Sequence, residues 1–326
     1  MEEMKCRARE EKNGIKKISV TIPCYNEEEN VYEMYAAVTE LMQRYDGIYN
    51  YEILFSDNDS TDGTRAILRN IAEEDRHVKV IMNARNFGPE RSGWNSMFRA
   101  EGDVVVNIPC DFQAPPELIP QGIKLWEEGS LIVCGQKRKS RENKIKFFLR
   151  QVFYGIIKLM SDVKQYDNLT GLILMDRTII EAVQAAYEPG DEFRFLIADL
   201  GYKISILQYE QQKRRAGKSS YNMARCFDFA ITSLVNTSWV PLRLATVAGV
   251  LVSAACFLLG VVYFVYKLVH WDTFDAGIAP LLIGMFFIGS VQLLFIGIVG
   301  EYVGSVLRKI SKDPLVVEEE TINFDE

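Results

Sequence analysis

The sequence predicts an α/β domain with a Rossmann-like, mostly parallel sheet, followed by two transmembrane helices. Two observations predict this fold class. Between residues 16 and 129, a short apolar strand, a polar turn and a helix of 3.6-residue period recur four times, as in right-handed βαβ units. In the last third, two long stretches are almost free of charge, as in membrane spans.

The four strand–turn–helix units follow one another without long insertions. The polar turns after the strands lie at 23–30, 56–62, 83–93 and 109–116. In a parallel sheet such turns leave from one edge, and ligands bind beyond the carboxyl ends of the strands. We therefore expect a single crevice lined by all four turns.

Residues 244–268 and 278–300 are the expected transmembrane helices. Each would be roughly 35 Å long, enough for a hydrocarbon core of ~30 Å. Buried core helices are the alternative, but no large domain remains to bury them. The expected organisation is a flexible N-terminus (1–15), the α/β domain (16–221), a juxtamembrane amphipathic helix (222–241), a transmembrane hairpin (242–308) and a cytoplasmic tail (309–326).

The distribution of basic residues predicts the orientation in the membrane. The link 269–277 contains no Lys or Arg, whereas basic residues flank the outer ends of both spans. The positive-inside rule then places the catalytic domain and both termini in the cytoplasm, in a protein integral to the plasma or inner membrane. The charged start of the chain is not a signal peptide. The glycines of the second span would suit a homo-oligomer.

Composition excludes several classes of function. The net charge is −7, which argues against a nucleic-acid partner. The six cysteines are scattered without a C-x-x-C pair, so neither a zinc ribbon nor a disulfide framework is expected. The stretches 145–160 and 223–239 mix basic and large apolar residues at helical spacing. They would suit helices on a membrane surface, with ordinary amphipathic core helices as the alternative.

Five motifs occur in order along the chain: "TIPCYNEEENV", "SDNDSTDGT", "ARNFG", "CDFQAPPELIP" and "RRAGKSSY". Together with the two C-terminal spans, they resemble the family-2 glycosyltransferases of the GT-A fold. Within that family the chain is similar to the polyprenyl-phosphate glycosyltransferases, such as dolichol-phosphate mannose synthase and the bactoprenol glucosyltransferases. The resemblance runs from about residue 16 to residue 312.

The resemblance implies a nucleotide-sugar donor bound at the first three turns. Asp57 and Asn58 end a strand, where an acid and an amide can serve a base or ribose edge. The other residues implied at the nucleotide are Pro23, Tyr25, Glu27 and Asn86. Asp62 is expected to cap the helix 64–74. Asp59 stands where the family usually has glycine.

The resemblance also implies a divalent cation, Mg²⁺ or Mn²⁺, at Asp111. Relatives commonly carry an acid-x-acid triplet here, whereas this chain reads Pro109-Cys110-Asp111. Such a cation is held by one or two protein carboxylates together with substrate phosphates, so one acid is chemically sufficient. Gln113 could add an amide oxygen or hold a coordinated water. We therefore expect a working site with a single acid.

Basic residues ahead of the membrane are expected to bind the acceptor. The pattern R-x-x-G-x-S-x-Y fits Arg214 and Ser219, with Lys218 between them, and Arg suits bidentate phosphate recognition. The resemblance adds Arg138 from a second basic run, and it makes Asp111, Arg214 and Ser219 the catalytic residues. The alternative is a basic stretch that touches lipid headgroups.

The predicted function is an inverting transfer of a sugar from a nucleotide sugar to a polyprenyl phosphate at the cytoplasmic leaflet. The expected sugar pocket is where the sequence departs most from relatives. The segment "TGLILMDR" at 170–177 lacks the acid that directly follows the glycine in their motif, and Asp167 could compensate for it. The alternatives are a membrane-anchored nucleotide-sugar-binding scaffold without activity and a transferase to an alcohol acceptor. The acidic tail "VVEEETINFDE" is expected to be disordered or to dock on a partner subunit.

Overall fold

The structure is a computed structural model that describes residues 15–137, 169–187, 197, 201–212, 240–269, 278–310 and 314–324. The chain divides into two compact units. The first comprises Met1–Phe147, Gln165–Ser220 and Lys312–Glu326, and the second comprises Phe148–Lys164 and Tyr221–Ser311. The first unit is therefore discontinuous, because the end of the chain returns to it.

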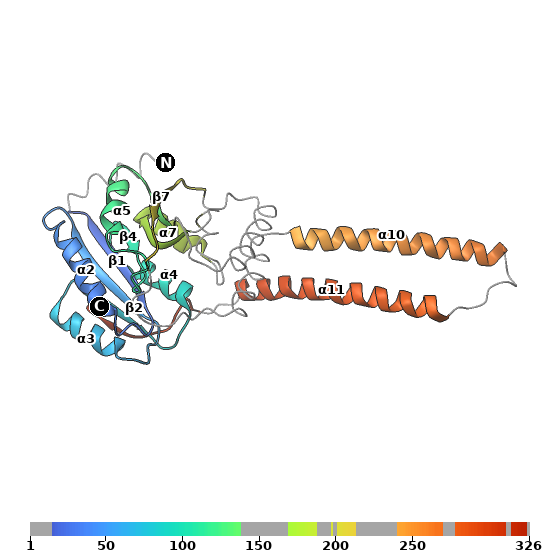
Figure 1. The fold of residues 1–326 in the computed structure, drawn as a ribbon, viewed down its shortest axis with the longest axis horizontal. Coiled ribbons are helices and arrows are strands. Elements are labelled where there is room, and N and C mark those ends of the chain that lie inside the picture. The colour runs from blue at the N-terminus through green and yellow to red at the C-terminus, as the bar shows by residue number, and fades with distance from the viewer. Residues whose placement is uncertain are drawn as a thin grey trace. The chain divides into compact units, whose positions relative to one another are not determined.

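The first unit is built on an eight-stranded sheet with the order β7-β5-β6-β4-β1-β2-β3-β8, and Figure 1 labels β1, β2, β4 and β7 of this sheet. Strands β1, β2, β3 and β4 are mutually parallel, and β5 is parallel to β7. Strand β6 is antiparallel to both β4 and β5, and β8 is antiparallel to β3. The strands are β1 (Lys17–Cys24), β2 (Asn50–Asp57), β3 (Val78–Asn83), β4 (Val104–Asn107), β5 (Ile132–Lys137), β6 (Leu169–Asp176), β7 (Ile204–Tyr209) and β8 (Glu318–Ile322). This mostly parallel sheet confirms the predicted fold class.

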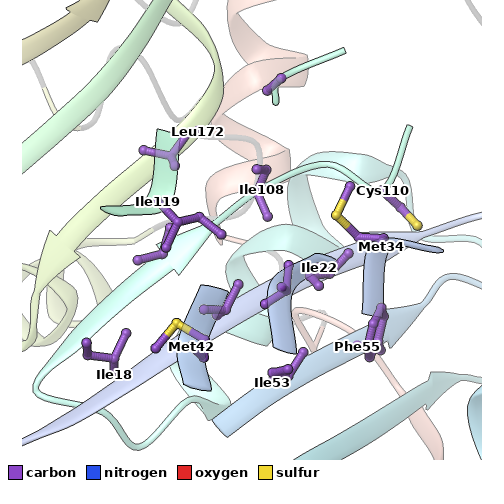
Figure 2. Close-up of a cluster of buried hydrophobic side chains, with 14 of the residues drawn as sticks. Ile18, Ile22, Met34, Met42, Ile53, Phe55, Ile108, Cys110, Ile119 and Leu172 are labelled. Atoms are coloured by element: carbon purple, nitrogen blue, oxygen red, sulfur yellow. The ribbon is translucent and has the colours of Figure 1, made fainter. Parts of the chain in front are cut away.

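Helices cover both faces of the sheet, because the apolar residues of a buried parallel strand point alternately to either side. In β2, Ile53 and Phe55 face one core and Leu54 faces the other. The first core is closed by α2 (Val31–Gln43), α3 (Thr64–Glu74) and α5 (Leu118–Glu127), and Figure 2 shows part of it. The second core is closed by α4 (Pro89–Arg99) and α7 (Arg177–Ala186). The result is a three-layer α/β domain.

Four charged side chains close the amino-terminal edge of the sheet. Lys17 Nζ lies 2.7 Å from both Glu52 Oε2 and Glu101 Oε2. Lys79 Nζ lies 3.1 Å from Glu52 Oε2 and 2.9 Å from Glu101 Oε1. Glu52 is buried, and each of its neighbours supplies a charge or a hydrogen bond that offsets its loss of hydration. This edge is therefore held by paired charges.

The second unit contains two long helices, α10 (Val240–Val269) and α11 (Ile278–Ile310). Segments Leu242–Val262 and Phe287–Leu307 are long and apolar enough to cross a membrane. Most of their described side chains are exposed rather than packed in a core. The expected surface helices at 145–160 and 223–239 lie outside the described residues.

The C-terminal tail differs from its expectation of disorder or docking on a partner. Glu318–Ile322 forms β8 and pairs with the edge strand β3 of the same chain, with Ile81 opposite Thr321 and Met82 opposite Glu320. The tail therefore belongs to the α/β unit. Its acidic residues form ion pairs with arginines of that unit, and for this reason a segment rich in glutamate can be ordered as an edge strand.

Candidate functional site

Every segment expected to bind substrate starts from one edge of the sheet. The parallel strands β1, β2, β3 and β4 end there at Cys24, Asp57, Asn83 and Asn107. Because β6 is antiparallel to β4 and to β5, its start at Leu169 and the end of β5 lie at the same edge. The end of β7 at Tyr209 and the start of β8 at Glu318 lie there too. The turns that were predicted to line one crevice therefore all leave from the carboxyl edge of the sheet.

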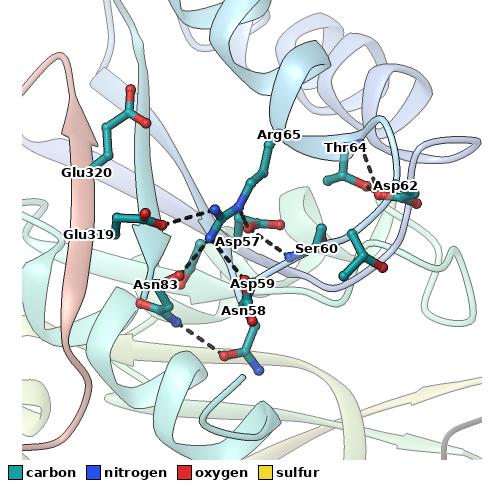
Figure 3. A network of polar contacts seen from close by, with 12 residues as sticks. Asp57, Asn58, Asp59, Ser60, Asp62, Thr64, Arg65, Asn83, Glu319 and Glu320 are labelled. Atoms are coloured by element: carbon teal, nitrogen blue, oxygen red, sulfur yellow. Dashed lines mark hydrogen bonds and ion pairs between the residues drawn. The ribbon is translucent and has the colours of Figure 1, made fainter. Parts of the chain in front are cut away.

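Asp57 is the most deeply buried acid at this edge, with no exposed surface. Its Oδ2 accepts hydrogen bonds from the Ser60 N–H at 3.1 Å and from Arg65 Nε at 2.7 Å (Figure 3). Its Oδ1 is buried and has no hydrogen-bond partner among the described residues. Since an unpaired buried carboxylate oxygen is costly, this atom suits a donor group from a ligand.

Arg65 was not anticipated from the sequence, yet it holds Asp57 in place. Its Nη2 donates to the Asn83 carbonyl at 2.6 Å, and its Nη1 donates to Glu319 Oε2 at 3.0 Å. The sequence signal was present but indirect: a buried acid needs a cation, and Arg65 lies in the first turn of the helix that follows Asp57. The helical pattern alone marks it only as a surface residue.

Asn58 and Asn86, both expected to contact the nucleotide, contact each other. Asn58 Nδ2 donates to Asn86 Oδ1 at 3.0 Å. Asn58 Oδ1 accepts from Asn83 Nδ2 at 3.3 Å and from the Phe87 N–H at 3.0 Å. Asn86 Oδ1 also accepts from the Gly88 N–H at 2.9 Å. These amides fix the turn between β3 and α4 beside Asp57.

The first turn contains Pro23, Tyr25 and Glu27. Pro23 lies opposite Ser56 in the register of β1 and β2, and Tyr25 is exposed. Glu27 is buried, and its Oε2 accepts from Asn30 Nδ2 at 2.6 Å. Its N–H donates to Thr64 Oγ1 at 2.9 Å, which ties the first turn to the start of α3.

Asp62 caps α3 as expected, although the residue at the cap position itself is Gly63. Asp62 Oδ1 accepts from the Thr64 N–H at 3.0 Å and from Thr64 Oγ1 at 2.6 Å. Asp59 has a positive φ of 67°, the backbone region that favours glycine. That conformation would account for the glycine that the family resemblance implies at this position, and aspartate is among the residues that tolerate it.

Asp111 lies on a loop whose residues alternate between core and crevice. Ile108, Cys110, Phe112 and Ala114 are buried, whereas the residues between them, Asn107, Pro109, Asp111 and Gln113, are half-buried. Phe112 has a positive φ of 57°, a strained conformation for an aromatic residue. The Asp111 Oδ1 atom accepts from the Gln113 N–H at 3.1 Å. The loop is thereby anchored by its apolar residues and presents one carboxylate.

The Asp111 loop contacts the segment that follows β7. The Gln113 carbonyl accepts from the Gln212 N–H at 3.2 Å, and Gln211 Nε2 donates to Gln113 Oε1. The basic motif that starts at Arg214 follows Gln212 two residues later in the sequence and lies outside the described residues.

Gly171 packs closely against Tyr209 and against Ala114 of the Asp111 loop. Its φ is 82°, and an added Cβ would lie 2.5 Å from Tyr209 Oη and 2.8 Å from Ala114 Cβ. Tyr209 Oη donates to the Thr170 carbonyl at 3.2 Å. The role of Thr170 and Gly171 in a sugar pocket stays a prediction. The other sugar-pocket residue considered, Asp167, lies outside the described residues, as do Arg138, Arg214, Lys218 and Ser219.

Two family models match the chain. Glycosyl transferase family 2 matches residues 19–183. The chain belongs to glycosyltransferase family 2. The model of the GtrB C-terminal hairpin matches residues 240–306, which contain α10 and most of α11. The predicted membership of this family and the predicted enzyme class are confirmed.

Individual relatives cover nearly the whole chain. An uncharacterised glycosyltransferase of Synechocystis is 30% identical over 302 residues, covering 91% of this chain and 93% of that protein. A prophage-derived bactoprenol glucosyl transferase of Shigella flexneri is 29% identical over 299 residues, covering 91% and 96%. Among solved structures, the mannosyltransferase PcManGT of Pyrobaculum calidifontis in complex with GDP-Man and Mn²⁺ has a TM-score of 0.43 at 17% identity, covering 93% and 89%.

Proposed function

We propose that this glycosyltransferase moves a sugar from a nucleotide-sugar donor to a polyprenyl phosphate, with inversion, at the cytoplasmic face of the membrane. The observation that carries the proposal is that the groups expected to bind the donor and the cation, and the residues that precede the basic segments, lie at the carboxyl edge of the sheet. These are the buried Asp57, the Asp111 loop, Lys137 and Gln212. The bactoprenol glucosyl transferases among its relatives support the acceptor class.

The donor half of the site is supported by Asp57 and the turn beside it. The buried Asp57 Oδ1 atom suits an N–H or O–H group of a base or ribose. The amides of Asn58 and Asn86 fix the neighbouring turn and so shape the wall of that pocket. Glu27 ties the first turn to α3 and encloses the same region.

A divalent cation fits the carboxylate of Asp111, in the single-acid form that the sequence suggests. Among the residues that the structure describes, no group of three or more His, Cys, Asp or Glu side chains could hold a metal ion. A Mg²⁺ or Mn²⁺ held by one carboxylate, waters and the donor's diphosphate needs no such group. When bound, it would neutralise the charge that develops on the leaving diphosphate.

The acceptor half requires little acid–base catalysis from the chain. A phosphate monoester has a second pKa near ~6 and is largely ionised at neutral pH. Its oxygen attacks the anomeric carbon, the bond from that carbon to the donor's diphosphate breaks, and the electron pair leaves on the diphosphate. Arg214, Lys218, Ser219 and Arg138 remain the proposed acceptor-phosphate residues, and in the sequence they follow Gln212 and Lys137, which lie at this edge.

The membrane hairpin would bring the lipid acceptor to this site. Two helices are long and apolar enough to span a membrane, and basic residues flank the outer end of each. By the positive-inside rule, the α/β unit and both termini face the cytoplasm. The polyprenyl chain would then stay in the membrane while its phosphate reaches the carboxyl edge.

The test is transfer from a panel of radiolabelled nucleotide sugars to undecaprenyl phosphate in membranes, with Mn²⁺, Mg²⁺ or a chelator. We expect a metal-dependent labelled lipid that survives mild base and releases free sugar in mild acid. Asp111→Asn should lower its formation by about a hundredfold, as expected for a group that stabilises the leaving charge. Glu117→Gln removes an exposed carboxylate at the start of α5 and should leave it unchanged.

Two outcomes would overturn the proposal and favour an alternative. A product stable to mild acid, formed only when an alcohol acceptor is supplied, would make the protein a transferase to alcohols. Tight binding of a nucleotide sugar without any product, whatever the acceptor, would make it a scaffold. Equal activity of Asp111→Asn and the wild type would remove Asp111 from the catalytic site.

A further inference from the structure

We propose that Arg65 is a positioning residue of the donor site and that the C-terminal strand β8 completes this site through Glu319. The inference deepens the proposed function and rests on it, because it assigns Asp57 to the nucleotide. It assigns a role to a residue on α3 and to one in the tail, neither of which the donor motifs contain. Both residues act through Asp57 rather than on the substrate.

The guanidinium of Arg65 is fixed on several sides at once. Nε donates to Asp57 Oδ2 at 2.7 Å, Nη2 to the Asn83 carbonyl at 2.6 Å, and Nη1 to Glu319 Oε2 at 3.0 Å. Asp59 Oδ1 lies 3.6 Å from Nη2. Figure 3 shows Arg65 between Asp57 and Glu319, with β8 on the far side of the arginine. Glu319 thus takes the one guanidinium nitrogen that the donor turns do not engage.

This arrangement decides which oxygen of Asp57 is presented. Arg65 and the Ser60 N–H both bind Oδ2, so the carboxylate is held at one oxygen. The buried Oδ1 is left without a described partner, and the buried side chain cannot rotate freely. A carboxylate fixed in this way accepts a hydrogen bond from a base or ribose without first being reorganised.

Strand β8 does not depend on Glu319 to stay docked. It is paired to β3 at Glu318 and from Glu320 to Ile322, with a register irregularity that passes over Glu319. Further hydrogen bonds attach the tail to the domain on both sides of Glu319. Arg91 donates to the carbonyls of Leu315 and Pro314, and Asn95 Nδ2 donates to Glu318 Oε1 at 2.8 Å. Asn323 Nδ2 donates to the carbonyls of Ala72 and Val78 at 2.7 and 2.8 Å. Replacing Glu319 should therefore alter Arg65 without releasing the strand.

The neighbouring residue provides a matched control. Glu320 Oε2 forms an ion pair with Arg69 at 2.7 Å, one turn further along α3. Among the described residues, no hydrogen bond or ion pair joins Arg69 to Asp57, whereas Arg65 is ion-paired with it. Glu319 and Glu320 therefore differ in their link to the donor site while sharing a strand, a charge and an arginine partner.

The experiment compares Glu319→Lys with Glu320→Lys in the full-length protein. Binding of UDP, GDP and CDP with Mn²⁺ is measured by calorimetry, donor KM and kcat by transfer assay, and Tm by thermal unfolding. Glu319→Lys removes an exposed ion pair and adds a repulsion, so we expect Kd and donor KM to rise by about three- to tenfold with kcat unchanged. Glu320→Lys should change Kd and donor KM less than about twofold and lower Tm equally.

Arg65→Lys is the conservative variant that tests the arginine itself. Lysine keeps the charge beside Asp57 but cannot bind Asp57, Asn83 and Glu319 together. For Arg65→Lys we expect the Kd of the bound nucleoside diphosphate to rise about tenfold. Adding Glu319→Lys to Arg65→Lys should raise this Kd little further, because both changes act through the same contact with Asp57.

Each outcome separates this inference from the proposed function. If the wild type binds none of the three diphosphates and transfers no sugar, the proposed function fails and the inference fails with it. If the wild type binds one of them and the two tail variants behave alike, the inference alone is wrong. Independent effects of Arg65→Lys and Glu319→Lys would also contradict it.

Discussion

At the scale of single residues, the close packing at Gly171 gives a prediction with its own control. Gly171 and Gly201 both have positive φ, at 82° and 72°, so an alanine at either strains the backbone by about 1 kcal/mol. Only at Gly171 would the new Cβ also meet atoms, 2.5 Å from Tyr209 Oη and 2.8 Å from Ala114 Cβ. We expect Gly171→Ala to lower stability by about 2–4 kcal/mol and to impair transfer, because it displaces the Asp111 loop.

Gly201→Ala meets nothing within 4 Å and should lower stability by about 1 kcal/mol with activity unchanged. Thermal unfolding and transfer assays on the two variants make the comparison. Equal losses in both would mean that the backbone conformation matters at Gly171 and that the close packing does not.

Single residues also show what the sequence can predict of the site and what it cannot. Asp57 and Asp111 are recognisable because one acid ends a buried strand and the other lies in the turn that follows a buried strand. Arg65 escapes notice because its value depends on Glu319, which lies 254 positions along the chain. Asn58 shows the converse, because its side-chain amide is hydrogen-bonded to Asn83, Asn86 and Phe87. Sequence places a polar group at the edge, but only the fold decides which neighbours it binds.

At the scale of elements, the Asp111 loop predicts the effect of restoring a second acid. Pro109 and Asp111 are half-buried residues of the alternating loop, on either side of the buried Cys110. Two carboxylates on that side would both be available to a cation. We expect Pro109→Asp to lower the Mn²⁺ concentration for half-maximal transfer by about tenfold, since a second charged ligand contributes on the order of 1.4 kcal/mol.

Pro115→Asp removes a proline and adds the same charge further along this loop, so it controls for the field of an extra acid. Manganese titrations of transfer activity compare the two variants. A similar shift in both would show that general charge, and not a second ligand, attracts the cation.

Elements also differ in how well they can be predicted from their own sequences. The strands β1, β2, β3 and β4 were expected because each apolar run is followed by a polar turn and a helix. Strand β8 was not, because "EEETI" looks solvated on its own. It is held by the open edge of β3 and by Arg69, Arg91 and Asn95, all remote in sequence. Local pattern predicts elements that carry their own apolar face and misses those that depend on distant partners.

At the scale of the whole molecule, the two edges of the sheet use charge in opposite ways. At the carboxyl edge Asp57 keeps one oxygen unpaired among the described residues. At the amino edge the carboxylates of Glu52 and Glu101 are paired with Lys17 and Lys79. The first arrangement favours a ligand, and the second favours stability.

The amino edge predicts a loss of stability in acid. Hydrogen bonds from Lys17 and then Lys79 lower the pKa of Glu101 from 4.5 to about 2. Burial opposes ionisation of Glu52, but bonds from Lys17 and Ser19 outweigh it and lower its pKa as well. A carboxylate whose pKa is depressed on folding stabilises the protein above about pH 4.5 and loses that contribution as the pH falls towards 2.

Glu101→Gln should therefore lower Tm at pH 7 and weaken the fall in Tm between pH 5 and pH 3. Half of the Glu101 side chain is exposed, so screening limits the difference at pH 7 to about 1 kcal/mol. Glu40→Gln breaks only the exposed pair with Arg44 and should leave the acid profile unchanged. If Glu101→Gln loses as much stability in acid as the wild type, the charge network at the amino edge does not set the acid limit.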